Sequence, residues 1–112
     1  FNSDSSNSYN NVWMVGDGSS ATGSKQVNAS QIRVTNAVLD TTPSVTIIQI
    51  MDYTATDKHK PVLIRSNTSG SDAEAFAGAG RYASTSAISA IEVRAGGNFN
   101  SGSTFYLYGI AS

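Results

Sequence analysis

The residue type most often used for acid–base chemistry occurs only once in this chain, at His59. Asp57 lies two positions earlier and would share a face with His59 if a strand already began there, a geometry that suits a carboxylate-oriented imidazole. A catalytic triad also needs a nucleophile in a strained turn and an oxyanion site, and no stretch of the sequence marks either. We therefore interpret His59 as a surface histidine flanked by lysines, predict no catalytic residues and expect the chain not to be an enzyme.

Metal and cofactor chemistry has equally little support. The chain has no cysteine, so no thiolate site is available, and its eight acidic residues are scattered without the spacing of a calcium loop. The glycines of Gly78-Ala79-Gly80 and Gly96-Gly97 lack the G-x-G-x-x-G spacing and the strand-to-helix context of a dinucleotide-binding fold. We predict turns at these glycines, and we expect no metal and no cofactor.

Aromatic side chains supply the one binding chemistry that the sequence suggests. Rings that stack on the C–H faces of sugars, beside a polar rim of Asn and Asp, would suit a carbohydrate-binding module. Most of these rings lie inside predicted strands, where packing in a core or an interface is the commoner role. The candidate ligand-stacking residues are Trp13, Tyr53 and Tyr82. Further candidates are Tyr9 and the Tyr106/Tyr108 pair.

Composition argues against several classes of partner. The formal net charge is −1, so there is no basic footprint and we expect no nucleic acid to bind. No apolar run approaches the roughly 20 residues that cross a bilayer, so we expect no membrane insertion. Only 13% of the residues are charged, about half the usual share for a soluble domain. Ser, Thr, Asn, Gly and Ala replace them, as in extracellular β-modules, fibre proteins and virion surfaces.

The chain is long enough for one domain with its own core. Residues 1–11 are almost wholly Asn, Ser and Asp and bury too little to offset their ordering entropy, which predicts a polar N-terminal arm or linker. Residues 12–112 then form a single domain. Trp13, the only tryptophan, is interpreted first as a core anchor within the apolar run 12–15.

Short stretches with strand composition recur between turn signals. Residues 45–53 are predicted to be a central strand, and residues 58–65 an edge or bulged strand because Pro61 lacks an N–H. Residues 19–28 are predicted to be loop, and residues 73–77 at most a turn of helix. Further strands are predicted at 12–15, 31–39, 81–83, 85–95 and 104–110. This pattern predicts an all-β fold, an antiparallel β-sandwich of the jelly-roll or Greek-key type.

The predicted strand at residues 104–110 has two apolar faces. Phe105 and Leu107 lie on one side, and Tyr106, Tyr108 and Ile110 lie on the other. A strand of this kind is covered on both sides. We therefore predict that Phe105 and Leu107 fill the core, and that the face with the two tyrosines and Ile110 contacts a neighbouring layer or subunit.

The same C-terminal stretch resembles a known family ending. The sequence Gly97-Asn98-Phe99-Asn100-Ser101-Gly102-Ser103-Thr104-Phe105-Tyr106-Leu107-Tyr108-Gly109-Ile110 is similar to the ending of tailed-bacteriophage virion structural proteins, which close with a pattern like G-N-F-x-x-G-S-T-F-x-L-Y-G-I. Residues 57–63, and residues 81–82 followed by 87–91, look similar to the same group, although Pro61 departs from it. The resemblance implies a β-sandwich, typically trimeric, on a capsid exterior or a tail fibre, and it implies no catalytic residues.

Two functions from different classes remain open at this point. The first is a non-enzymatic virion surface module, a capsid decoration (cement) protein or a tail or fibre domain, that acts in particle assembly, stabilisation or host attachment. Its expected partners are further copies of itself, with a trimer favoured, and other virion proteins. The alternative is a carbohydrate-binding module, and the two overlap if a fibre tip binds a host-surface glycan.

Overall fold

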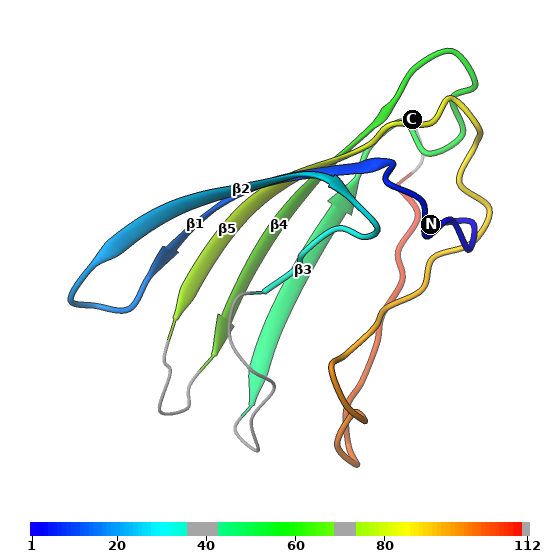
Figure 1. The fold of residues 1–112 in the computed structure, drawn as a ribbon. Coiled ribbons are helices and arrows are strands. Elements are labelled where there is room, and N and C mark those ends of the chain that lie inside the picture. The colour runs from blue at the N-terminus through cyan, green and yellow to red at the C-terminus, as the bar shows by residue number, and fades with distance from the viewer. Residues whose placement is uncertain (36–42, 69–73, 111–112) are drawn as a thin grey trace.

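The chain forms one antiparallel β-sheet. The computed structural model describes residues 1–35, 43–68 and 74–110, and in these ranges it contains strands and irregular segments but no helix. The strands are β1 (Tyr9–Gly16), β2 (Ala21–Ala29), β3 (Ser44–Ile50), β4 (Lys60–Thr68) and β5 (Ala75–Tyr82). Their order in the sheet is β2-β1-β5-β4-β3 (Figure 1). The all-β prediction is confirmed, but a second sheet, which a sandwich requires, is not found among the described residues.

Alternation along the strands gives the sheet two different faces. In β4, every second residue from Lys60 to Ser66 is buried, and the residues between them are exposed. The cross-strand register extends this division over the whole sheet. We call the buried side the inner face; its central residues are Tyr9, Asn11, Trp13, Val15, Ile48, Ile50, Lys60, Val62, Ile64, Ser66, Phe76, Gly78, Gly80 and Tyr82.

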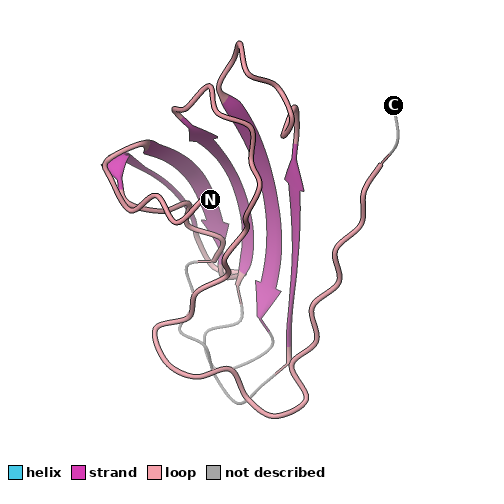
Figure 2. Ribbon diagram, turned by 90° about the vertical axis from the view of Figure 1, so that its right-hand side faces the viewer, coloured by secondary structure: helices cyan, strands magenta, loops and turns pink. Residues whose placement is uncertain are grey.

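Irregular chain covers the inner face in place of a second sheet. Figure 2 shows the N-terminal segment and the chain after β5 running in front of the strands on this side. Ile88, from the segment after β5, is buried with Tyr9 and Tyr82, and Phe1 packs against the same cluster. Ile32, from the segment after β2, packs against both core clusters. The layer that covers the inner face is therefore built from irregular segments, not from strands.

Two asparagine side chains attach this layer to the sheet. The buried Asn11 donates from Nδ2 to the Gln31 carbonyl at 3.0 Å, and its Oδ1 accepts from the Arg33 N–H at 3.2 Å. Asn2 acts similarly on the segment after β5, where its amide bonds the Ala87 carbonyl at 2.8 Å and the Ser89 N–H at 2.8 Å. These amides replace the ladder hydrogen bonds that irregular chain cannot make for itself.

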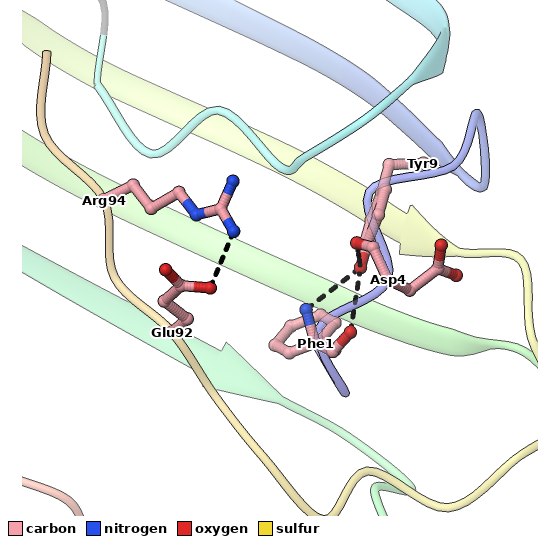
Figure 3. Close-up of polar contacts among 5 residues, drawn as sticks. All are labelled: Phe1, Asp4, Tyr9, Glu92 and Arg94. Carbon is pink, nitrogen blue, oxygen red and sulfur yellow. Dashed lines mark hydrogen bonds and ion pairs between the residues drawn. The ribbon is translucent and has the colours of Figure 1, made fainter.

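The N-terminal residues contact the start of β1. This strand begins at Tyr9, three residues before residue 12, where the domain was predicted to begin. Figure 3 shows the Phe1 nitrogen donating to the Tyr9 hydroxyl at 2.9 Å, and the same hydroxyl lies 3.0 Å from the Asp4 carbonyl oxygen. Burial raises the pKa of Tyr9 to about 12. Nearby, Arg94 and Glu92 form an exposed ion pair at 2.8 Å.

The hairpin between β1 and β2 shows why residues 19–28 were wrongly predicted to be loop. β2 is almost entirely exposed and carries few apolar side chains, so it lacks the alternation that marks a strand in sequence. Its order comes from main-chain pairing with β1 and from the turn. There the Asp17 carboxylate accepts from the N–H groups of Ser19 at 2.8 Å and Ser20 at 2.7 Å, which holds the pKa of Asp17 well below its ordinary value.

The structure corrects three other predictions of secondary structure, two of strands and one of a turn of helix. Residues 45–53 were expected to be central, but β3 lies at the sheet edge and ends at Ile50. β4 is interior, not an edge, and Pro61 is tolerated because it lies opposite Met51, where the pairing with β3 ends. The region expected to give a turn of helix is strand β5 from Ala75 onward, and residue 73 lies outside the described residues.

Three predicted strands are irregular segments instead, and one of them is the C-terminal stretch 104–110, which pairs with no strand among the described residues. Residues 85–95 form no strand, because Asn2 and Tyr53 bond their main chain in place of a neighbouring strand. Residues 31–35 are likewise irregular and are bonded by Asn11, and residues 36–39 of that prediction lie outside the described residues.

Candidate functional site

Among the residues that the structure describes, the most exposed apolar segment is the C-terminal arm, which we define as residues 104–110. A β-turn at residues 100–103 precedes it, closed by a 3.1 Å bond from the Ser103 N–H to the Asn100 carbonyl, with Gly102 at φ +89°. No main-chain hydrogen bond joins residues 104–110 to any other described residue. Figure 2 shows the arm extended beside the sheet, on the side where β3 forms the edge.

The arm's large side chains face solvent on both sides. Its five large apolar residues are between 61% and 91% exposed, namely Phe105, Tyr106, Leu107, Tyr108 and Ile110. The prediction that Phe105 and Leu107 fill the core is wrong for this structure, because the irregular segments occupy the inner face instead. The chain's own sheet does not cover the face with Tyr106, Tyr108 and Ile110 either, so its contact with a partner subunit stays a prediction.

The arm has local order of its own. The rings of Tyr106 and Tyr108 are nearly parallel, with 6.4 Å between centroids and 14° between planes, as expected for residues i and i+2 of an extended chain. Phe105 makes an edge-on contact with Phe99 across the turn, at 5.0 Å between centroids. The arm is thus presented as an extended apolar segment without any charged residue.

A second apolar surface lies on the outer face of the sheet, the side opposite the inner face. We call it the outer patch. Its large side chains are between 45% and 66% exposed, and they are Val12, Met14, Val45, Ile47 and Leu63. Between those of β1 and β4, β5 presents only Ala75, Ala77 and Ala79. The patch therefore extends across β1, β5, β4 and β3. Arg65 lies within it, and two further basic residues border it: Lys25, which pairs with Val12, and Arg81, which follows Ala79 on the same face.

The ligand-stacking candidates do not form one platform. Tyr82 is only 3% exposed and its ring stacks on Tyr9, so its stacking surface is used internally. Trp13 is half-buried on the inner face, and the Arg33 guanidinium lies over its ring at 5.1 Å from the centroid. Tyr53 is exposed but lies in the connection between β3 and β4. The structure thus places these three aromatics in separate environments.

Acid–base and metal chemistry gain no geometric support. His59 and Asp57 are both exposed in the connection before β4, where Lys58 pairs with Asp52 at 3.6 Å. Within residues 1–35, 43–68 and 74–110, no three His, Cys, Asp or Glu side chains lie close enough to hold a metal ion. The same ranges include no helix of sufficient length and hydropathy to span a membrane.

Sequence reasoning found the arm but missed the outer patch as a surface. Val12 and Met14 stood in a short apolar run that was interpreted as a strand with a core anchor, and Leu63 stood in a strand expected at an edge. The available signal was the double-sided apolar character of residues 45–50, with Val45 and Ile47 on one face and Ile48 and Ile50 on the other.

In comparisons with known proteins, no family model, no curated protein and no solved structure matches this chain. The exposed arm and the outer patch are the two apolar surfaces that the described residues offer to a partner.

Proposed function

We propose that this chain is a non-enzymatic structural module of a phage virion surface, a capsid decoration or a tail or fibre domain, that works as a homo-oligomer. The observation that carries the proposal is the C-terminal arm, because it combines the phage-like ending with large apolar side chains left in solvent. On this proposal the module lies on the particle exterior and acts in assembly, stabilisation or host attachment.

The physical argument rests on the cost of exposed apolar surface. Burying a large apolar side chain is worth about 1.5–3 kcal/mol, and five of them lie on the arm. Large contiguous apolar patches are rare on monomers and mark interaction sites. Neither surface carries an acidic residue. Arg65 lies within the outer patch, and Lys25 and Arg81 lie at its border, so a contact confined to the apolar side chains would cover only the Arg65 guanidinium.

The sandwich that the sequence predicted is proposed for the assembly. Two sheets that pack face to face bury apolar residues between them at about 10 Å separation. The outer patch has the alternating apolar residues for such a contact, and neighbouring copies would supply the second layer. A trimer is the expected size, as the resemblance implies.

Light scattering coupled to size-exclusion chromatography tests the assembly. We expect a mass of several chains at micromolar concentration, and we expect Met14→Lys and Leu63→Lys to weaken it because each introduces a charge into the outer patch. The matched control is Thr85→Lys, an exposed position in the irregular segment after β5. A wild-type chain that stays monomeric would contradict the proposal.

The virion location needs a separate measurement. Mass spectrometry of particles purified from the source cells should find this chain at a fixed copy number relative to the major capsid protein. Recovery of the chain only outside particles would remove the virion assignment and leave the oligomer intact.

Carbohydrate binding is the second candidate, and one observation favours it. The parallel rings of Tyr106 and Tyr108 are exposed and offer two stacking surfaces on one side of the arm. A glycan array would show binding that Tyr106→Ala and Tyr108→Ala both abolish. An array without a hit, or hits that both variants retain, would remove this candidate.

A further inference from the structure

We propose that the C-terminal arm of one chain adds as a strand to the free edge of β3 in a second copy. This rests on the proposed homo-oligomer and names the two segments that would join its copies. Both are strand-like, both have open main-chain groups, and the same chain carries donor and acceptor. Strand addition to an open edge is an established mode of recognition.

No residue in the described part of the chain pairs with the outward side of the acceptor, β3. The Met51 N–H donates to the Pro61 carbonyl at 3.1 Å, and the Val45 N–H points to the Asn67 side chain at 3.3 Å. Odd-numbered residues of β3 therefore direct their main-chain groups toward β4, and the alternation of an antiparallel ladder directs those of Thr46, Ile48 and Ile50 outward. No described residue pairs with this side of β3.

The two edges of the sheet differ in how they are protected. β2 carries Lys25 and a bulge opposite the start of β1, where Asn28 has φ +54° and bonds the Asn10 side chain. Charges and bulges are the usual devices that block edge-to-edge pairing. β3 has none of them, because the sequence Ser-Val-Thr-Ile-Ile-Gln-Ile contains no charge, proline or glycine and its ladder is regular. β3 is thus the edge that is open to pairing.

The donor matches the acceptor in length and in chemistry. β3 spans seven residues, Ser44–Ile50, and the arm spans the equal range 104–110. β3 is apolar on both faces, with Val45 and Ile47 on the outer face and Ile48 on the inner face. The arm is also apolar on both faces, so an added arm would extend the outer patch and the inner face at once.

The arm's own orientation favours a second copy as the acceptor. It lies extended on the β3 side of the molecule without a main-chain bond to the sheet (Figure 2). Exchange between copies would pair the outward main-chain groups of β3 with the facing groups of the arm, and a closed ring of such exchanges would cover every β3 edge. The proposal therefore predicts that the arm and the β3 edge are both needed for assembly.

Paired variants test the exchange. Thr46→Pro removes one outward N–H of β3 and leaves the ladder with β4 intact, since proline is tolerated where an edge N–H faces solvent. The matched control, Thr46→Val, keeps the N–H. The second variant ends the chain after Ser103 and so lacks the arm. Sedimentation velocity should give the single-chain mass for Thr46→Pro and for the arm-less chain, and the wild-type mass for Thr46→Val.

Mixing the two deficient chains supplies the decisive measurement. Thr46→Pro keeps its arm and the arm-less chain keeps its edge, so an equimolar mixture should form a complex of two chains that neither forms alone. Binding of a synthetic peptide of residues 103–112 to the arm-less chain gives the same answer even if Thr46→Pro fails to fold. A wild-type oligomer that both variants retain, or a mixture and a peptide that do not bind, would overturn the exchange and leave assembly through the outer patch. A monomeric wild type would overturn both.

Discussion

The phenol rings of Tyr9 and Tyr82 are stacked, with 4.9 Å between their centroids and 16° between their planes. They pair across β1 and β5, and both are almost fully buried. Ionisation of either ring would place a negative charge inside the core, so burial raises the pKa of both, to about 12 for Tyr9. The pair therefore makes the fold sensitive to alkali.

Stability should fall as the pH rises from about 10 toward 12. The ordinary pKa of tyrosine is 10.0 and that of folded Tyr9 is about 12, so between these values the folded state holds a proton that the unfolded state releases. The stabilisation is complete below pH 10 and is lost as the pH rises through the folded pKa. Thermal melting across this range should show a smaller alkaline loss for Tyr9→Phe than for wild type. Equal losses in the two proteins would contradict this account, and Tyr53→Phe, at an exposed ring, is the control.

Gly78 allows the Phe76 ring to lie flat along β5. A Cβ at residue 78 would come within 2.7 Å of Phe76 Cε1, and the ring is buried in the core with little space to move. Gly78→Ala should therefore destabilise the fold by about 1–3 kcal/mol, the usual cost of overpacking. Urea unfolding followed by Trp13 fluorescence measures this. Gly96→Ala is the matched control, since a Cβ there meets nothing within 4 Å and should leave the midpoint unchanged.

Sequence patterns predicted the fold class and the strands with strong apolar character. Residues 45–50 and 60–65 carry enough β-branched and aliphatic side chains to identify strands β3 and β4. β2, and all of β5 except residues 81–82, were missed because their order comes from pairing with β1 and β4, and their small or polar residues carry no periodic signal. The arm was found because residues 104–110 are apolar on both faces. Periodicity alone does not distinguish a strand covered by its own chain from a segment that is exposed in the single chain.

The irregular layer over the inner face was beyond sequence reasoning for a different reason. It depends on long-range bonds from single side chains, such as that between Asn2 and Ala87. Asparagine is so frequent near the N-terminus that no local pattern distinguishes Asn2 or Asn11 from its neighbours. The predicted strand at residues 85–95 failed for this reason.

Asn11→Ala should test how much one amide contributes to the irregular layer. The substitution removes two partly buried hydrogen bonds, to the Gln31 carbonyl and from the Arg33 N–H, and each is worth about 0.5–1.5 kcal/mol. We expect a lower melting temperature and faster amide exchange at Arg33. Asn7→Ala, at an exposed position, is the control and should behave as wild type. Unchanged exchange at Arg33 in the Asn11 variant would show that the Asn11 amide is not needed to hold this segment, which also packs through Ile32 and Val34.

Two opposing effects determine how much Lys60 contributes to the stability of the fold. Its side chain is fully buried, and its ammonium donates to the carbonyls of Lys58 at 2.9 Å and Ser84 at 3.2 Å. Burying a charge is costly, so an apolar replacement can stabilise a protein when it removes both the charge and its partners. Here the partners are main-chain carbonyls that remain after substitution. The loss of their charged donor should therefore outweigh the relief from burying the ammonium.

Lys60→Met keeps most of the side-chain volume and should therefore destabilise the fold by about 1–3 kcal/mol. The control is Lys58→Met, which removes only an exposed ion pair with Asp52 and should cost at most about 1 kcal/mol. Urea unfolding of both variants at neutral pH separates the two effects. If Lys60→Met were as stable as wild type, the desolvation cost of the ammonium would cancel the gain from its two hydrogen bonds. The contact of Lys60 with the start of the segment after β5 would then position that segment without adding net stability.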